Sequence, residues 1–308
     1  MHSELNTLKV NADHHCHHVL RSVLHAAMLW WLFHAGLSWA GLAIFLAHYV
    51  VGILSITVAY HRYFSHKTFK TSRFTQLIMA AIGCAQMQGG PLIWGAIHRH
   101  HHSTSDTPED LHSPIRGFYE SHYGWLMNPK TYEIGFGTRL KDLARFKELV
   151  WLDRYSFVPI LGYFAALWLS GHLYAVFNSA SDIDGLFVLM WGGVVRVVVV
   201  WHVTWSVNSV CHVWGSRPFK TQEDSRNNFW VAILSFGEGW HNNHHRFPFA
   251  ARNGFGWKQP DVSYCFIWFM SKLGIFWDVN AVSVERLKVV ELVKEAPAMP
   301  EHATRTTL

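Results

Sequence analysis

The chain has 308 residues, of which 50% are apolar, 15% are aromatic and 15% are charged, with a formal net charge of +5. Soluble domains carry about 25% charged residues, so this composition favours a membrane protein. The basic residues are not gathered on one polar segment, which argues against a nucleic-acid partner. The four cysteines lie far apart without a CxxC pair, so neither a zinc knuckle nor a disulfide framework is expected.

The N-terminal part of the chain combines a polar stretch with a long apolar run. Residues 1–18 are polar and rich in histidine, and we interpret them as a tail. Residues 22–60 contain no Asp, Glu, Lys or Arg. Because a bilayer crossing takes about 20 apolar residues, this run predicts two spans, at about 20–36 and 41–60, joined by a tight turn near Gly36–Gly41. One very long buried helix is the alternative.

A second pair of apolar runs lies in the middle of the chain. Residues 155–181 are uncharged, and residues 185–216 contain one charge, Arg196. These runs predict spans at about 156–178 and 185–208. An ion that faces lipid is costly, so Arg196 is expected to face the helix bundle.

The basic residues lie mostly in the polar segments 62–154 and 217–272. Positive charge is retained on the cytoplasmic side of a membrane, so both segments and both termini are expected there. The expected fold is therefore all-α and integral to the membrane, with four spans in two hairpins. Its membrane domain would comprise residues 19–280, followed at 281–308 by an amphipathic segment and a polar tail.

Two further apolar stretches are expected to lie at the membrane surface. Residues 74–97 are uncharged, but they contain Gly89-Gly90-Pro91, which breaks a helix. A full crossing there would also put the flanking polar segments on opposite faces, so we expect this run along the interface or against the bundle. Residues 262–277 are aromatic and contain Lys272, which is typical of an interfacial helix.

The 23 histidines are the most unusual feature of the composition. Three clusters have the spacing of metal ligands and adjoin the ends of apolar segments: HRYFSH at 61–66, HRHHH at 98–102 and HNNHH at 241–245. Positions i, i+3 and i+4 share one helix face, so each HxxHH cluster is expected to present three imidazoles in one direction. The candidate ligands are His61, His66, His98, His101, His102, His241, His244 and His245.

The ligand type alone does not identify the metal, because imidazole binds Zn, Cu, Fe and Ni. The zinc-hydrolase motif HExxH is absent, and so is a cysteine quartet. Nearby carboxylates lack the Glu-x-x-His spacing of soluble di-iron bundles: Asp106, Glu109, Asp110 and Glu238. Eight imidazoles are more than one ion can use, which favours two metal ions. Two irons held almost wholly by nitrogen at a membrane surface would suit oxygen activation on an alkyl chain.

In order, spacing and neighbouring residues, these motifs resemble those of the membrane fatty-acid desaturases related to stearoyl-CoA desaturase. The resemblance covers roughly residues 20–280 and includes RGFYESHYGW at 116–125, NSVCHVWG at 208–215 and GEGWHNNHHRFP at 237–248. It implies a cytosolic helical cap that carries a di-iron site, with His212 as a ninth ligand and Asn208 as a ligand through water. It also implies a narrow, kinked tunnel for the acyl chain.

The implied activity is the insertion of a cis double bond, of the delta-9 type, into a saturated fatty acyl chain, with O2 as co-substrate. No GxGxxG fingerprint of a flavin or nicotinamide site occurs, so the two electrons are expected from a ferredoxin, a rubredoxin or a cytochrome. Ala96 and Ile97 stand where the animal acyl-CoA enzymes have an Arg-Asp pair, and QGGPLIW at 88–94 resembles bacterial and cyanobacterial delta-9 relatives. Acyl-CoA and acyl-lipid substrates both stay open. The expected location is the bacterial inner membrane, with a cytoplasmic active site.

The remaining histidines receive simpler interpretations. His100 occupies the non-ligand position of the second box and is expected to point elsewhere, while the context of His122 suggests that it contacts a ligand rather than a metal. Others lie in apolar spans and are interpreted as structural: His25, His34, His48, His172 and His202.

Two alternative functions share part of this pattern. A membrane di-iron hydroxylase or alkane monooxygenase uses the same three-box chemistry, and the residues around His212 and the third box favour desaturation over it. A metal transporter would place its ligands near the bilayer midplane, whereas these clusters fall at the predicted cytoplasmic ends of the spans.

Overall fold

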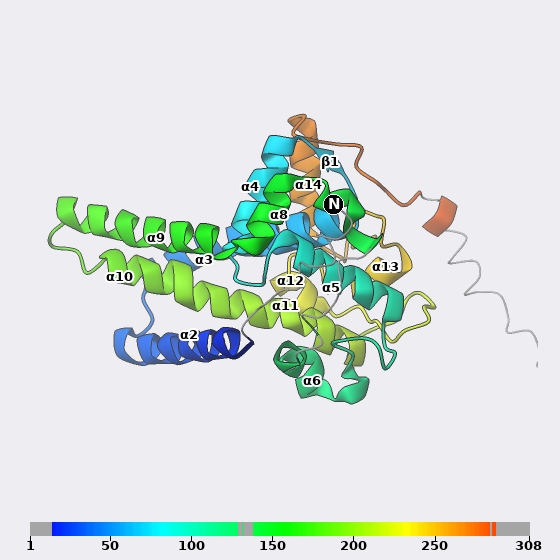
Figure 1. Ribbon diagram of the computed structural model, residues 1–308, viewed down its shortest axis with the longest axis horizontal. Coiled ribbons are helices and arrows are strands. Elements are labelled where there is room, and N and C mark those ends of the chain that lie inside the picture. The colour runs from blue at the N-terminus through cyan, green and yellow to red at the C-terminus, as the bar shows by residue number, and fades with distance from the viewer. Residues whose placement is uncertain (1–13, 129–130, 132–137, 284, 288–308) are drawn as a thin grey trace, which may run out of the picture.

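The computed structural model describes residues 14–128, 131, 138–283 and 285–287, and this part of the chain is mostly helical (Figure 1). Long helices extend side by side toward one end of the molecule, and shorter helices gather at the other end. The long segments are α2 (His14–Ala35), α3 (Trp39–Leu54) continued by the π-helix η1 (Ser55–Ser65), α9 (Phe157–Phe177), and α10 (Gly185–Val188) continued by the π-helix η6 (Leu189–Val195) and α11 (Arg196–Val213).

Within the described residues, three helical segments are long and apolar enough to cross a membrane: Trp39–Ser65, Phe157–Phe177 and Gly185–Val213. They correspond to the spans predicted at 41–60, 156–178 and 185–208. The first and third extend beyond their predicted C-terminal ends, because each helix continues without a break into a segment that carries a histidine motif.

The span predicted at 20–36 forms α2, which is 22 residues long. At about 1.5 Å per residue this helix is long enough for a crossing. Arg21, His25 and His34 lower its hydropathy, and it is not among the three helices above. The arrangement of four spans in two hairpins therefore stays a prediction. The helix begins at His14, within the stretch predicted as a tail, whose residues 1–13 lie outside the described part.

The predicted turn near Gly36–Gly41 lies between α2 and α3. Gly36 has a φ of +64°, a conformation that favours glycine. Ser38 is the N-cap of α3, and its hydroxyl accepts a hydrogen bond from the Gly41 amide at 3.0 Å. The two helices are thus separated by a short, well-capped connection, and α2 packs mainly against η6 and α11.

The apolar run at 74–97 is interrupted, as its glycines predicted, and does not form a single helix. It divides into α4 (Arg73–Cys84) and α5 (Pro91–Thr104), and Gly89 between them has a φ of +94°. The Asp153 carboxylate caps α5 by accepting hydrogen bonds from the amides of Leu92 and Ile93 at 2.9 and 3.0 Å. This cap fixes the direction of α5, which carries the second histidine box.

The remaining short elements surround α5 and the ends of the long helices. A two-stranded antiparallel sheet pairs β1 (Lys70–Thr71) with β2 (Phe276–Trp277), in register Lys70↔Trp277. It holds the chain after α14 against the segment that follows η1. The other elements are η2 (Pro114–Arg116), α6 (Phe118–His122), η3 (Gly124–Met127), η5 (Thr138–Leu140), α7 (Lys141–Ala144), α8 (Lys147–Arg154), α12 (Phe229–Leu234), α13 (His241–Arg246) and α14 (Val262–Lys272). The helix predicted at 262–277 is thus confirmed as far as Lys272.

Arg196 faces the inside of the bundle, as predicted. Its side chain is fully buried and donates hydrogen bonds to the Gly192 carbonyl at 3.0 Å and to the Gln86 side chain. Its guanidinium also lies 5.0 Å from the centre of the Tyr163 ring. These contacts keep the charge away from lipid and link α11 to the start of the connection between α4 and α5.

Candidate metal centre

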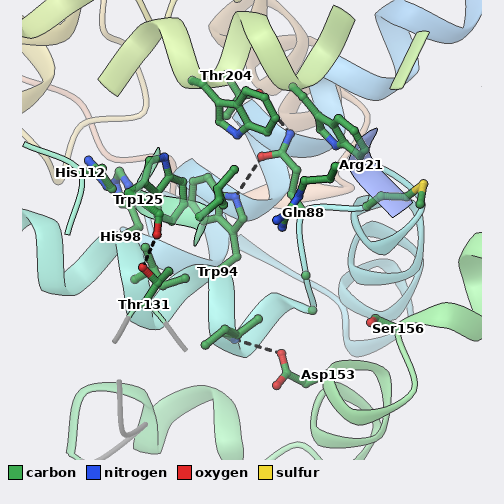
Figure 2. A pocket seen from close by; sticks show the side chains of 18 of the residues that line it. Arg21, Gln88, Trp94, His98, His112, Trp125, Thr131, Asp153, Ser156 and Thr204 are labelled. Atoms are coloured by element: carbon green, nitrogen blue, oxygen red, sulfur yellow. Dashed lines mark hydrogen bonds between the residues drawn. The ribbon is translucent and has the colours of Figure 1, made fainter. Parts of the chain in front are cut away.

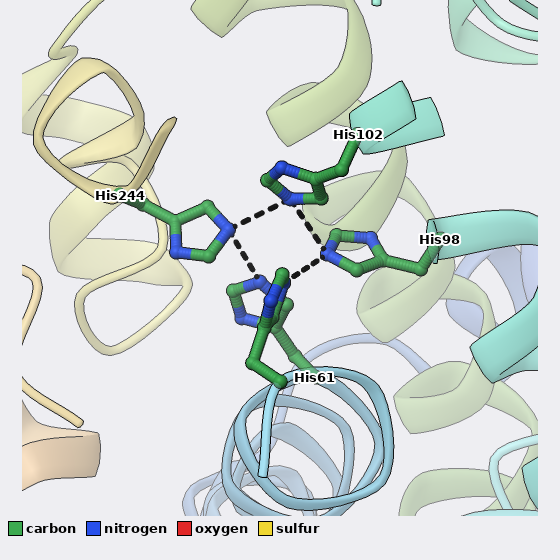
Figure 3. Close-up of side chains that lie close together, drawn as sticks. His61, His98, His102 and His244 are labelled. Carbon is green, nitrogen blue, oxygen red and sulfur yellow. Dashed lines mark hydrogen bonds between the residues drawn. The ribbon is translucent and has the colours of Figure 1, made fainter. Parts of the chain in front are cut away.

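The structure brings all nine histidines predicted as ligands together, although they come from four separate segments of the chain. They form two clusters, and within each cluster the candidate ligand nitrogens lie within 4.8 Å of one another. The five-histidine cluster contains His61, His66, His98, His102 and His244, and the four-histidine cluster contains His101, His212, His241 and His245. Figure 3 shows side chains of the five-histidine cluster converging from three directions.

Each HxxHH box contributes to both clusters. In the second box, on α5, His98 and His102 belong to the five-histidine cluster and His101 to the four-histidine cluster. In the third box, on α13, the division is reversed, since His244 joins the five and His241 and His245 join the four. The sequence correctly placed three imidazoles on one helix face, but that face lies between two sites, so the three do not serve a single ion.

A π-helix brings the two histidines of the first box together. On an α-helix, residues five apart are about 140° apart around the axis, which would separate His61 from His66. In η1 the amide of His66 bonds to the carbonyl of His61 at 3.2 Å, five residues back, which is the π-helical pattern. With about 4.4 residues per turn the two side chains are only about 50° apart. Their ring centres lie 4.9 Å apart.

The Nε2 atoms of the five-histidine cluster face one another around a common point. They lie 3.0 Å apart for His61 and His244, 2.8 Å for His66 and His98, 3.1 Å for His98 and His102, and 2.9 Å for His102 and His244. In the four-histidine cluster, His212 and His241 approach to 3.0 Å through their Nε2 atoms. The Nε2 atoms of His101 and His245 are buried without a hydrogen-bond partner in the described part of the chain. Such a donor set fits a bound cation.

Burial keeps most of these imidazoles uncharged. In six of them, burial lowers the pKa far below the ordinary histidine value, and the neighbouring histidines lower it further. These six are His66, His98, His102, His241, His244 and His245. A neutral imidazole has a free lone pair, which is the form that binds a metal. The clusters are thus electrostatically prepared for cations.

Four carboxylates hold the other ring nitrogen of cluster histidines. The Nδ1 atom of His101 donates to Asp110 at 3.0 Å, and that of His212 donates to Asp106 at 2.8 Å. The Nδ1 atom of His61 lies 2.6 Å from Glu238, and that of His245 lies 3.2 Å from Glu223. A carboxylate on Nδ1 turns Nε2 toward the metal and raises its basicity.

The pKa values of three of these carboxylates are lowered, as this role requires: Asp106, Asp110 and Glu238. Burial by itself would raise the pKa of Asp106, but the hydrogen bond and the charge of His212 outweigh it and lower the pKa to about 2. Burial would likewise raise the pKa of Glu238, whereas the charge of Arg62 lowers it. The Glu-x-x-His spacing expected of direct ligands did not reveal this supporting role of Asp106, Asp110 and Glu238. Their position within a few residues of the boxes was the available signal.

We expect Asp110→Asn to lower the affinity of the four-histidine cluster for metal by about 10- to 100-fold, because the amide no longer fixes the His101 ring with a negative charge. The measurement is competitive metal binding against a chelator. Asp142→Asn is the matched control. Asp142 pairs at 2.8 Å with Arg99, which lies on α5 as His101 does, but Asp142 contacts no cluster histidine. Equal affinities in the two variants would contradict the role given to Asp110.

Other residues singled out in the sequence lie around the clusters. His100 points away from them, as predicted, with its Nε2 2.9 Å from the Glu109 carbonyl. His122 does not contact a cluster histidine in the described part of the chain. It bonds instead to Ser209 and His202. Asn208 lies in neither cluster but lines the adjacent cavity, and its role through water stays a prediction.

A cavity of about 260 Å³ extends from the five-histidine cluster between α5, α11, and the starts of α2 and α9 (Figure 2). His98 lines it at the cluster. Its walls are mainly aromatic and aliphatic and include Ile93, Trp94, Ile97, Trp125, Trp201 and Trp205. The Gln88 amide donates to the Thr204 hydroxyl at 3.2 Å and forms one of its few polar contacts. A long apolar group entering this cavity would meet the candidate metal centre.

Comparison with known proteins gives a consistent result. The family model described as fatty acid desaturase matches residues 29–259. The sn-2 palmitoyl-lipid 9-desaturase of Nostoc sp. (strain 36) is 37% identical over 83% of this chain and 87% of its own length. Delta-9 acyl-lipid desaturase 1 of Arabidopsis thaliana is 37% identical over 83% of this chain and 81% of its own length. The chloroplastic palmitoyl-monogalactosyldiacylglycerol delta-7 desaturase of Arabidopsis thaliana is 38% identical over 80% of this chain, which spans 64% of that relative.

Proposed function

The chain belongs to the fatty acid desaturase family, and we propose that it inserts a cis double bond at the delta-9 position of a saturated fatty acyl chain, using O2 and two electrons from an external donor. It is a membrane oxidoreductase acting on fatty acyl lipids. The observation that carries the proposal is the pair of adjacent histidine clusters, one of which lines a mainly apolar cavity through His98.

The donor set fits two iron ions, one held by His61, His66, His98, His102 and His244, and one by His101, His212, His241, His245 and, through water, Asn208. When bound, these ions supply the oxidation of an unactivated C–H bond by O2, a reaction that side-chain acids and bases cannot start because a methylene has no acidic proton. The cluster histidines act as ligands and not as general acids.

The protein positions the acyl chain. The mainly apolar walls of the cavity would bind the acyl chain and position it beside His98. Trp94 stacks on the His98 ring at 5.1 Å between centres, so the cavity wall and a candidate ligand support each other. Which methylene reaches the centre depends on the depth and shape of this cavity.

The acyl carrier we propose is a membrane lipid. Relatives from Nostoc and Arabidopsis are named as acyl-lipid desaturases, although an Anemone leveillei relative is named as an acyl-CoA C20 Delta5-desaturase. Ala96 is fully buried and Ile97 is apolar, so no charged pair stands at these positions to bind a CoA head group. The proposed donor is a ferredoxin, a rubredoxin or a cytochrome.

The proposed topology has four spans in two hairpins in a bacterial inner membrane, with the metal centre in a cap on the cytoplasmic side. The membrane domain would be 19–280, between the terminal segments 1–18 and 281–308. Support comes from the three apolar helices and from the position of the clusters, which include His61 and His212 in the last turns of Trp39–Ser65 and Gly185–Val213.

The experiment is the fatty-acid profile of a desaturase-deficient bacterial host, by gas chromatography with double-bond localisation. We expect a new cis-monounsaturated acid with the intact chain and with His100→Ala, and none with His241→Ala. Lipid-class separation after a short acyl label tells acyl-lipid from acyl-CoA desaturation. A hydroxylated product would favour the monooxygenase alternative, and iron binding without O2 use or product would favour the transporter.

A further inference from the structure

Three histidines outside the metal clusters form a continuous hydrogen-bonded chain. His25 on α2 lies 3.1 Å from His202 on α11, Nε2 to Nε2. The other nitrogen of His202 lies 3.0 Å from Nε2 of His122 on α6. The Nδ1 atom of His122 then lies 2.9 Å from the Ser209 hydroxyl. The chain thus joins three helices and ends on a fully buried serine.

Both ends of this chain are bound to backbone carbonyls. At the outer end, Nδ1 of His25 donates to the Arg21 carbonyl at 2.7 Å. At the inner end, the Ser209 hydroxyl lies 3.0 Å from the Trp205 carbonyl, to which it can donate. A carbonyl only accepts hydrogen bonds, so the position of every proton between the two ends can be counted.

The count allows two complete states. In the neutral state, Ser209 donates to His122, His122 to His202, His202 to His25 and His25 to Arg21. With one added proton, the three inner bonds reverse, and the Ser209 hydroxyl turns to the Trp205 carbonyl. The four bonds that link the Arg21 carbonyl, the three imidazoles and Ser209 are kept in both states, and the bond from Ser209 to the Trp205 carbonyl forms only in the protonated state. A second added proton would leave two N–H groups facing each other, so the three imidazoles together take up no more than one added proton.

We propose that His25, His202, His122 and Ser209 form a relay that carries one proton at a time from the surface beside α2 to the buried Ser209. His202 is exposed and His25 and His122 are partly exposed, so the outer part of the relay lies at the protein surface. Ser209 is next to Asn208 in the chain, and Asn208 lines the cavity. The Ser121 hydroxyl, beside His122, donates to the Asn208 carbonyl at 3.0 Å.

The reaction requires such a supply, and in this the inference rests on the proposed function. Desaturation converts one –CH2–CH2– unit, O2, two electrons and two protons into –CH=CH– and two waters. The electrons come from the donor and the protons from solvent. The cluster histidines cannot deliver them, because protonation would remove the lone pairs that hold the metal. A separate route therefore keeps the ligands neutral during turnover.

The titratable and charged groups around the relay come from the three helices that it joins. Arg21 of α2 and Tyr123 at the end of α6 face the relay. The ring centre of Tyr123 lies 6.5 Å from that of His25. The Glu120 carboxylate of α6 lies beside Gly124. On α11, Arg196 is buried against Gln86 and Tyr163, away from His202. Burial lowers the pKa of His122 below its ordinary value, so this imidazole is neutral at pH 7 and ready to pass a proton on.

The first test counts protons and does not depend on activity. The full chain, purified with diamagnetic zinc in place of iron and labelled with 15N-histidine, is titrated by NMR from about pH 8 to about pH 4. We expect His25, His202 and His122 to take up one proton between them. In His202→Gln the two remaining histidines should each take up their own. Three protons in the unaltered chain, or none, would overturn the relay.

The second test separates proton supply from structure. Ser209→Ala and His122→Gln should lower turnover by about tenfold or more, with the greatest loss at high pH and an unchanged KM for the acyl substrate. Ser209→Thr keeps the hydroxyl and should retain turnover. His34→Gln is the control, since His34 bonds to the carbonyl four residues before it on the same helix, as His25 does. Unchanged turnover in Ser209→Ala would overturn the relay. Absence of product from the unaltered chain would overturn the proposed function, and the result of the proton count would not depend on it.

Discussion

His102→Ala is expected to remove metal from the five-histidine cluster and to abolish product formation. The Nε2 atom of His102 lies between those of His98 and His244, at 3.1 and 2.9 Å, so its loss breaks the ring of donors. Bound iron, measured by elemental analysis, should fall from about two ions per chain to about one, and product should fall by about 100-fold or more.

The matched control for this variant is His100→Ala. His100 lies on the same helix, two residues away, but its Nε2 contacts the Glu109 carbonyl and not a cluster. This variant should keep both iron and product. Full iron content and activity in His102→Ala would remove His102 from the ligand set, and loss of iron in His100→Ala would add a ligand that neither cluster contains.

Arg62→Met is expected to destabilise the protein by about 3–5 kcal/mol, because it leaves buried carboxylates without their cation. Arg62 is almost fully buried and lies 3.0 Å from both Glu238 and Asp261. It also donates to the Ala251 carbonyl at 2.7 Å. Since Glu238 contacts His61, the substitution should weaken metal binding as well. Thermal unfolding in detergent, with and without iron, measures both effects.

Lys70→Met provides the comparison for Arg62→Met. Lys70 pairs with Asp278 at 2.8 Å, but the two side chains are 68% and 62% exposed. An exposed pair is screened by water and contributes little to stability. The unfolding temperature of Lys70→Met should stay near that of the unaltered chain. Coincident unfolding curves for the two variants would show that the buried network around Arg62 does not support the fold.

Local pattern in the sequence was enough to predict the long apolar helices and the eight histidines of the three boxes. Apolar runs predicted the three segments that are long and apolar enough to cross a membrane, since a crossing requires a minimum length of apolar chain. Gly89-Gly90-Pro91 predicted the break between α4 and α5, because Pro91 cannot continue a helix and Gly89 takes a positive φ. His212 was reached only through the resemblance to a family, as a single histidine has no spacing to interpret.

The tertiary structure decided how the histidines are divided and what supports them. Spacing along one helix predicts which side chains share a face, but not that the face lies between two sites, as it does for His98 and His101. The π-helical turn that brings His61 and His66 together depends on packing, since their spacing of five residues is unfavourable on an α-helix. The contact between His61 and Glu238 and the chain from His25 to Ser209 join residues about 180 positions apart, and such partners are chosen by the folding of distant segments, not by local pattern.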